Sequence, residues 1–270
     1  MPPQYVRPYV KRNKNDATDA EAICEAVTRP QMRFVRVKSA EQQSVLMLHR
    51  ARELMIRQRT MLVNAMRGHC GELGIVVAQG VRNVATLMSL VNDADVKYVP
   101  PIARRVLNGL CEQLTTLQSR IVDLEREIVT WHRQNEASRR LQTIPGVGPI
   151  TASAIVATVA DAGQFRSGRE FAAWIGLVPK QHSSGGKDRL GGISKRGDAY
   201  LRRLLIHGAR TVVRWQRSGK TGGSDWLQGL LVRRHVNVAA VAVANKNARI
   251  AWAVLSTGEV YQAKKQLPER

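Results

Sequence analysis

The sequence has few acidic residues, few cysteines and no long uninterrupted apolar run. Among its 270 residues, 42 Lys and Arg stand against 21 Asp and Glu, which gives a formal net charge of +21 and a pI near 11.0. A field of this strength disfavours an ordinary enzyme of small-molecule metabolism. It favours a polyanionic partner, with nucleic acid first and an anionic membrane surface second.

Cysteine usage excludes two classes of site. Cys24, Cys70 and Cys111 lie far apart and form no Cys-x-x-Cys pair near histidines, so a zinc site is disfavoured. An odd number of cysteines indicates a reducing cytoplasm and not a disulfide framework. The chain has 21 Gly and 10 Pro, too few for collagen-like structure or for disorder along the whole chain.

From the apolar pattern we expect neither a signal peptide nor a membrane span. Its first residues, Met-Pro-Pro-Gln, contain no apolar core. The most apolar stretch, 236–255, is interrupted by Asn245, Lys246, Asn247 and Arg249. We therefore predict a buried or amphipathic helix there.

The first candidate site is a pair of carboxylates near the N-terminus. The alanine-rich spacing from Asp16 predicts a helix with Asp16 as its N-cap. Asp19 lies three residues further on, so both carboxylates share one helix face and together can hold a divalent cation. The alternative is that they only complement the helix dipole.

Two long helices follow. Ser39 and Gln42 form a capping-box pattern that starts a helix running to about Arg67, where Gly68, Gly71 and Gly74 interrupt it. The polar face of this helix is basic, and it is either a solvated surface or a nucleic-acid contact. Its basic residues are Arg50, Arg52, Arg57, Arg59 and Arg67.

The second helix starts at Pro101, a residue type suited to a first turn. Its apolar residues repeat at spacings of four and three: Leu110, Leu114, Leu117, Ile121, Leu124, Ile128 and Trp131. This heptad seam predicts either an antiparallel hairpin with the Ser39 helix or a coiled-coil dimer, and the spacing does not decide between them.

A glycine-rich turn at 144–148, Ile-Pro-Gly-Val-Gly, opens an alanine-rich helix. The pattern is typical of a helix-hairpin-helix element, in which turn amides and the helix N-terminus bind a backbone phosphate. A tight turn in which Gly146 and Gly148 merely permit close packing is the alternative.

The most basic segment follows this turn. Between Lys180 and Lys220 there are eleven Lys and Arg and two Asp, the charge pattern of a protein that binds a phosphate backbone. Glycines surround Ser183 and Ser184 and would let a strand come close to a serine hydroxyl, which needs a base or a metal for activation. His182 and His207 are nearby, and a solvated Ser-Gly loop is the alternative.

Several motifs together resemble one family. They are Asp16-Ala-Thr-Asp19, the 144–148 turn, Gly-Leu-Val-Pro at 176–179, Ser184-Gly185 and Ile-Ser-Lys-Arg-Gly at 193–197. Their order and spacing are similar to those of the DEDD transposases of the insertion-sequence IS-one-ten and IS-eleven-eleven family, over nearly the whole chain.

The resemblance implies a RuvC-like nuclease domain with an Asp-Glu-Asp-Asp magnesium site and a transposase domain with a nucleophilic serine. Asp16 and Asp19 match the last two carboxylates and would bind Mg²⁺, and Ser184 matches the nucleophile. DNA, a structured guide RNA and further copies of the chain, as a dimer or tetramer, are the implied partners. The residues expected to contact nucleic acid are Gly146, Gly148, Lys180, Lys187, Arg189, Lys195, Arg196, Arg202 and Arg203.

The first Asp and the Glu of such a site would precede Asp16 by many residues, whereas fifteen residues precede it here. We therefore expect a remnant of the RuvC-like domain, with half of the acidic site. The alternatives to an active transposase are an inactive remnant or regulator that only binds nucleic acid, and a basic protein of a ribonucleoprotein particle.

The expected fold is mostly α-helical. Residues 1–38 would be the RuvC-like α/β remnant, 39–137 the helical hairpin or coiled-coil arm, 138–262 the transposase domain with its helix-hairpin-helix-like turn, and 263–270 a tail. The expected location is the bacterial cytoplasm, in association with the nucleoid and not with a membrane.

Overall fold

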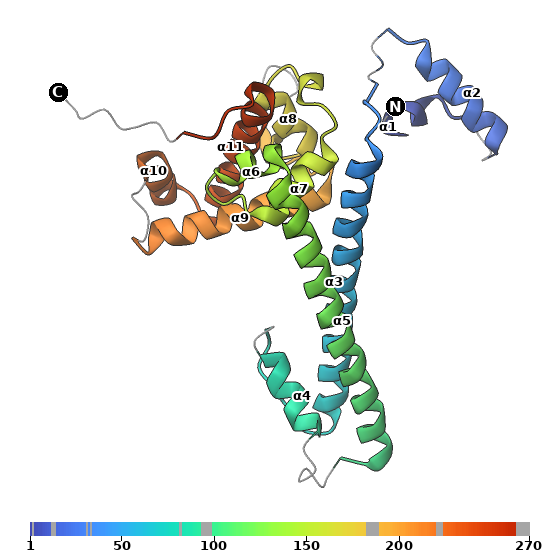
Figure 1. Cartoon of the computed structure of the whole chain (residues 1–270), viewed down its shortest axis with the longest axis vertical. Coiled ribbons are helices and arrows are strands. Elements are labelled where there is room, and N and C mark those ends of the chain that lie inside the picture. The colour runs from blue at the N-terminus through green and yellow to red at the C-terminus, as the bar shows by residue number, and fades with distance from the viewer. Residues whose placement is uncertain are drawn as a thin grey trace.

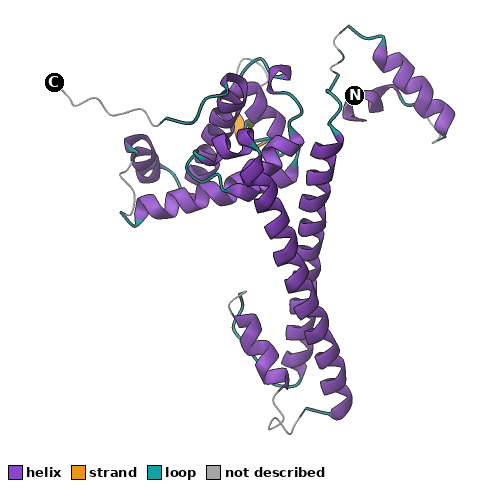
Figure 2. Ribbon diagram, in the orientation of Figure 1, coloured by secondary structure: helices purple, strands orange, loops and turns teal. Residues whose placement is uncertain are grey.

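The computed structural model describes residues 1, 3–11, 15–30, 32, 34–80, 83–92, 99–181, 189–219 and 224–262. In chain order the elements are α1 (Pro3–Val6), η1 (Arg7–Tyr9), α2 (Asp16–Val27), α3 (Ala40–Glu72), α4 (Val84–Asn92), α5 (Pro101–Gln134), α6 (Glu136–Gln142), α7 (Pro149–Thr158), η3 (Ala162–Gln164), α8 (Gly168–Ile175), β1 (Pro179–Gln181), β2 (Leu190–Ile193), α9 (Ala199–Arg217), α10 (Asp225–Arg233) and α11 (Val236–Thr257). Figure 2 shows that helices predominate, and the strands of the described residues form one two-stranded sheet. The prediction of a mostly α-helical chain is confirmed.

The helices α3 and α5 form a long arm. They lie side by side in Figure 1, with α6 to α11 gathered at one end of the arm and α4 beside the other end. Polar contacts join the two helices: the Arg52 Nη2 donates to Glu125 Oε1 at 2.6 Å, and Trp131 Nε1 donates to Glu41 Oε1 at 2.7 Å. The structure therefore contains the intrachain hairpin, one of the two arrangements that the heptad seam allowed.

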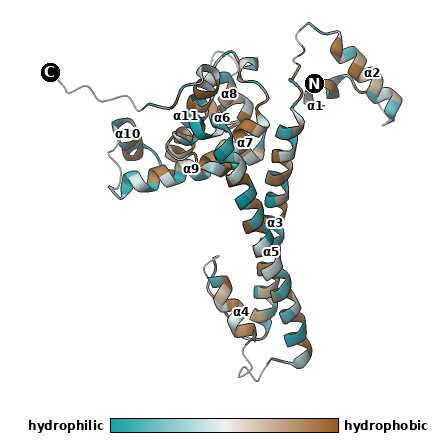
Figure 3. Ribbon diagram, viewed as in Figure 1, coloured by the Kyte–Doolittle hydropathy of each residue, from teal (hydrophilic) through white to brown (hydrophobic). Residues whose placement is uncertain are grey.

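The seam is buried on one side only. Leu114, Ile121 and Ile128 are buried, at intervals of seven residues, and Leu107 continues this series one heptad earlier. The alternate seam positions, such as Leu117, are half-buried. A single partner helix covers one edge of a heptad stripe more completely than the other, and Figure 3 shows hydrophobic and hydrophilic residues alternating along both helices.

The predicted helix starts are confirmed in two cases and wrong in one. Ser39 caps α3 by accepting from the Gln42 backbone N–H, and the Gln42 side chain accepts from the Ser39 N–H, which completes the capping box. Pro101 begins α5. The N-cap of α2 is Asn15 and not Asp16, because the Asn15 side chain accepts from Thr18 N at 2.7 Å.

The predicted end of α3 near Arg67 is also wrong, since the helix continues through Gly68 and Gly71 to Glu72. Each helical glycine costs about 1 kcal/mol, and the buried side chains around them, with α4 and α5, outweigh this cost. Gly74, at φ +75°, ends the helix. The backbone N–H of Ile75 donates to the Cys70 carbonyl and that of Gly74 to the Gly71 carbonyl, a Schellman motif.

The larger core lies among α6 to α11. Phe171 of α8 is fully buried, stacks on Trp174 with ring centroids 5.8 Å apart and meets the edge of Phe165 at 5.1 Å. α11 packs against α6, α8, α9 and α10. This arrangement makes α11 the central helix, and one of its faces lines the groove described below.

α11 confirms the predicted helix in the most apolar stretch. Two of the polar residues that interrupt the stretch have backbone partners: Asn245 donates to the Leu177 carbonyl at 3.1 Å, and Asn247 donates to the Pro145 carbonyl at 2.8 Å. They tie α11 to two of the loops that carry sequence motifs. Of the helices in the described part of the chain, none has the length and apolar character needed to cross a membrane.

Candidate nucleic-acid interface

The acidic pair sits in the first turn of α2. Asp16 is exposed and Asp19 is half-buried, and within the described residues neither carboxylate has a cationic partner, whereas Glu21 pairs with Lys11 and Glu25 with Arg29. The described residues contain no group of three or more metal-binding side chains. Among the described elements α2 packs only against α1 and η1, so no described contact within one copy of the chain joins its carboxylates to the basic segment.

The glycine-rich turn connects α6 to α7, and its two glycines differ. Gly146 has φ +85° and presses against α9, where a Cβ on Gly208 would lie 1.7 Å from the Gly146 carbonyl oxygen. Gly148 is exposed, caps α7, and has open space where a side chain would be. Close packing therefore explains Gly146, while Gly148 lies at a helix N-terminus that a phosphate can reach.

Two motifs that are distant in the sequence meet at the end of α8. Gly176 (φ +81°) and Gly197 (φ +79°) allow the two chain segments to touch, since a Cβ on Gly197 would lie 1.8 Å from the Trp174 carbonyl oxygen. The Arg202 guanidinium, through Nη1, donates to the Ile175 carbonyl at 2.8 Å and to the Arg196 carbonyl at 3.0 Å. Arg202 thus holds the junction together.

The strands β1 and β2 are antiparallel and border residues 182–188. The candidate nucleophile Ser184, its neighbours Ser183 and His182, and Lys187 lie outside the described residues. Four cations on the flanks are exposed: Lys180, Arg189, Lys195 and Arg196. The described flanks from 179 to 197 carry no carboxylate, and the Asp198 side chain is turned into α9, where it caps the Tyr200 and Leu201 amides.

The exposed face of α9 extends this cationic surface. Arg203 is paired: its Nη2 donates to Glu53 of α3 at 2.5 Å, and its guanidinium carbon lies 5.5 Å from the Tyr200 ring centroid. His207, the described candidate for a base, is exposed one turn further along. The described cations from Lys180 to Arg217 therefore lie on β1, on both sides of β2 in the sequence, and along α9.

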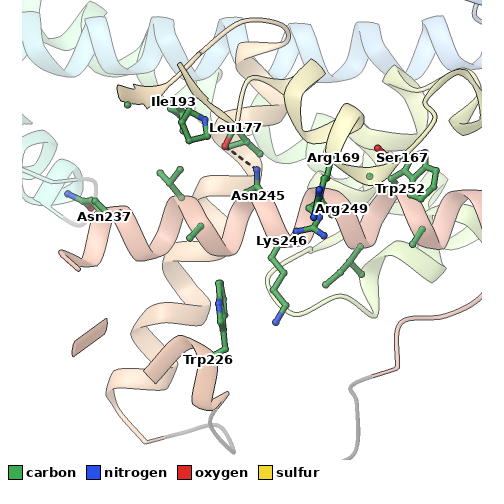
Figure 4. Close-up of a pocket in the computed structure, with 18 of the residues that line it drawn as sticks. Ser167, Arg169, Leu177, Ile193, Trp226, Asn237, Asn245, Lys246, Arg249 and Trp252 are labelled. Carbon is green, nitrogen blue, oxygen red and sulfur yellow. Dashed lines mark hydrogen bonds between the residues drawn. The ribbon is translucent and has the colours of Figure 1, made fainter. Parts of the chain in front are cut away.

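A groove of about 1340 Å³ opens beside the strand pair. Its walls come from Pro179 of β1, the Gly191–Ile193 part of β2, the start of α8, Trp226 of α10 and one face of α11. Figure 4 shows Ile193 and Leu177 on one side of α11 and Trp226 on the other. The groove thus begins at the two strands that flank Ser184.

The groove combines apolar surface with three cations. Arg169 and Arg249 lie next to each other in Figure 4, and Lys246 extends from the same helix as Arg249 with its Nζ 4.6 Å from the Trp226 ring centroid. Within the described part of the chain, none of the three has a carboxylate partner. Proteins that bind single-stranded nucleic acid combine cations, which contact the phosphates, with exposed aromatic rings, on which bases stack. Lys246 and Trp226 form such a combination.

Sequence reasoning does not find these groove residues. Trp226 and Lys246 are twenty positions apart on different helices, and Arg169 belongs to a third. The strand pair is also absent from the sequence-based expectations. The available signal is weak, because β1 and β2 are short and separated by a glycine-rich segment that resembles a loop.

Two family models match the chain. Residues 138–222 match the model described as "Transposase IS116/IS110/IS902 family", and residues 2–73 match a model described as "Transposase". The first match contains the strand pair and α9, and the second contains α2 and the whole of α3.

Curated relatives cover nearly all of the chain. It is 53% identical over 261 residues to a probable family 20 transposase of Pseudomonas aeruginosa, an alignment that covers 96% of this chain and 77% of the relative. It is 45% identical over 260 residues to the transposase for insertion sequence element IS1111A of Coxiella burnetii, covering 96% and 71%. The transposase for element IS1328 of Yersinia enterocolitica is 44% identical, covering 96% and 77%. The chain belongs to the IS110/IS116/IS902 family of insertion-sequence transposases.

Proposed function

We propose that this transposase binds DNA on its cationic C-terminal surface and cuts and rejoins phosphodiesters through a covalent intermediate on Ser184. The observation that carries the proposal is the strand pair that borders 182–188. Its described flanks hold four exposed cations and no carboxylate, and a groove with three further cations begins at the same strands. Such a surface can neutralise a DNA strand while a serine hydroxyl approaches phosphorus.

The proposed step exchanges one ester for another. The Ser184 hydroxyl oxygen forms a bond to phosphorus as the hydroxyl proton leaves, and the bond from phosphorus to one deoxyribose oxygen breaks. The departing sugar oxygen takes up a proton. Attack by the deoxyribose hydroxyl of a second strand on the serine ester then restores the free serine and joins the strands, so the number of phosphodiesters is conserved.

Asp16 and Asp19 fit a particular kind of magnesium site. Mg²⁺ is commonly held by one or two carboxylates together with substrate phosphate and water, and this pair is accessible, on one helix face and without a cationic partner among the described residues. When bound, Mg²⁺ would stabilise negative charge on phosphate oxygens. The two aspartates would position the ion and do no proton transfer themselves.

The proposal includes two further partners. A structured guide RNA is implied by the family resemblance and suits the net charge of +21. Self-association is supported by α3, where Met47, Leu54 and Met61 repeat at intervals of seven residues and are 70%, 49% and 71% exposed. An exposed apolar stripe at heptad spacing is typical of a helix that packs against another copy.

The decisive experiment is covalent capture of DNA by the full chain. The protein is incubated with Mg²⁺, with the RNA that co-purifies with it, and with DNA from an end of the insertion sequence that is labelled at either terminus. The covalent protein–DNA adducts are then resolved under denaturing conditions. We expect Ser184→Ala to abolish the adduct while DNA binding persists, because only the nucleophile is removed. Asp16→Asn and Asp19→Asn should slow adduct formation.

Ser183→Ala is the matched control, since it removes a hydroxyl from the adjacent residue. It should leave the adduct in place. If Ser183→Ala abolished the adduct and Ser184→Ala did not, Ser183 would be the nucleophile instead. Binding without any adduct, under all of these conditions, would favour the alternative of a protein that only binds nucleic acid.

A further inference from the structure

The exposed face of α9 carries a regular row of basic side chains. Leu201, Leu205, Ala209 and Val213 are buried and point into the core. The opposite face is exposed at intervals of four, three, four and three residues, at Arg203, His207, Arg210, Arg214 and Arg217. The row therefore follows one side of the helix from its beginning to its end.

The last three arginines line a separate notch. A cavity of about 440 Å³ lies between the C-terminal half of α9 and the start of α11, and Arg210, Arg214 and Arg217 contribute to its wall. Ser218 and Asn237 add polar groups. None of these residues lines the groove beside the strand pair except Asn237, which belongs to both.

These three arginines have no carboxylate partner within the described residues, in contrast to arginines elsewhere in the chain. Arg52 pairs with Glu125, Arg140 with Glu136, and Arg203, on the same face of α9, with Glu53. Three guanidinium groups within eight residues of one helix face repel one another. An anion seated among them would relieve that repulsion and accept their hydrogen bonds.

The start of α11 adds to the positive field. Asn237 belongs to the first turn of this 22-residue helix, and its N–H donates to His235 Nδ1 at 3.3 Å. The N-terminal end of a helix carries a partial positive charge. The notch thus places a helix N-terminus opposite three arginines that no described carboxylate neutralises.

We propose that this notch, at the far end of the cationic surface, is a second nucleic-acid site that grips the phosphate backbone away from the strand pair and reads no bases; the inference rests on the proposed function and assigns it a separate contact. Arg210 and Arg217 are seven residues apart, or about 10 Å along the helix. One strand of a duplex carries a phosphate every ~3.4 Å of axis, so this length spans about three phosphates. Three arginines therefore match three charges.

The test is the salt dependence of binding by the full chain. Each phosphate contact contributes about 0.9 to the slope of log affinity against log salt concentration. The variant Arg210→Gln, Arg214→Gln, Arg217→Gln should lose about 2.7 from the slope measured by anisotropy with a short random-sequence DNA duplex. The corresponding Arg→Lys variant keeps the charges and should retain most of the slope.

The matched control is Arg105→Gln, Arg120→Gln, Arg133→Gln. These three arginines of α5 are also exposed, so the control removes the same total charge from the arm. Its slope should remain at the wild-type value. Equal slopes for the notch and control variants would overturn the proposal, because the effect would then be one of net charge only.

An RNA duplex forms the second arm of the experiment and identifies the source of the phosphate. A loss of slope with only one of the two duplexes assigns the notch to that nucleic acid, and a loss with neither overturns the site. Ser184→Ala is titrated in parallel and should keep the wild-type slope. Failure of the proposed nucleophile, which is measured by adduct formation, is thereby distinguished from failure of the notch.

Discussion

The free energy of unfolding should depend on pH through His49, which lies where α3 packs against α7 and α9. This residue of α3 is 1% exposed. Its Nδ1 lies 3.0 Å from the Tyr200 hydroxyl of α9 and its Nε2 lies 3.2 Å from Ser153 Oγ of α7. The Ser153 hydroxyl donates to the Pro149 carbonyl at 2.7 Å, so it accepts from Nε2–H, and the Tyr200 hydroxyl donates to Nδ1. A neutral imidazole with its proton on Nε2 satisfies both contacts.

Burial, and next the positive charge of Arg52, lowers the pKa of His49 from 6.5 to about 4. A depressed histidine pKa in the folded state means that the neutral form is the stable one. The contribution of His49 to the free energy of unfolding is complete above 6.5, the pKa of this residue in the unfolded chain. It is lost as the pH falls toward 4, because the unfolded chain binds the proton first. Between pH 7 and pH 5 the loss amounts to about 2 kcal/mol.

The assay is urea denaturation of the wild-type chain and of His49→Gln at several pH values, followed by circular dichroism. Glutamine can donate to Ser153 and accept from Tyr200 without titrating. The wild-type free energy of unfolding should fall by about 2 kcal/mol more than that of the variant between pH 7 and pH 5. The difference between the two proteins cancels the titration of the carboxylates that they share. Parallel pH profiles would refute the assignment of a buried neutral histidine.

Two further predictions concern packing and thiols. Gly208→Ala should destabilise the fold by about 3 kcal/mol or more in the same urea assay, because its Cβ would overlap the Gly146 carbonyl oxygen. Gly229→Ala in α10, where the Cβ would meet open space, should instead stabilise by about 0.5–1 kcal/mol, and similar losses for the two variants would contradict the close contact. With Ellman's reagent the native chain should show one rapid thiol, Cys24, since the other two are buried and burial raises their pKa. Three equally rapid thiols would show that the arm core is open.

Local sequence signals predict the helix ends most reliably where two signals agree. Ser39 with Gln42 marks the start of α3 because both halves of a capping box are encoded within four residues. Asp16 is the wrong cap because several residues in a row are good caps, and only backbone geometry selects Asn15. The glycines of α3 give a false end, since tertiary packing against α4 and α5 overrides a helix propensity of about 1 kcal/mol.

The acidic pair, the serine segment and the basic segment can be identified from the amino-acid sequence alone, because each is a short run of residues with its own chemistry. Their motifs also indicate the family, which the relatives confirm. The seam of α5 predicts pairing with another helix but not the identity of that helix. A heptad pattern shows that one apolar face of the helix must be buried, but it does not identify the helix that buries it.

The amino-acid sequence alone determines which segments form helices, the large positive net charge and the positions of the candidate catalytic residues. These features depend on residue types and on near neighbours in the chain. Which cations are available to a ligand depends instead on how the helices pack. Arg202 is held by two backbone carbonyls and Arg203 by Glu53, whereas Arg210, Arg214 and Arg217 meet no carboxylate in the described residues. All five have the same charge in the sequence, and they differ because pairing depends on side chains that folding brings together from distant helices.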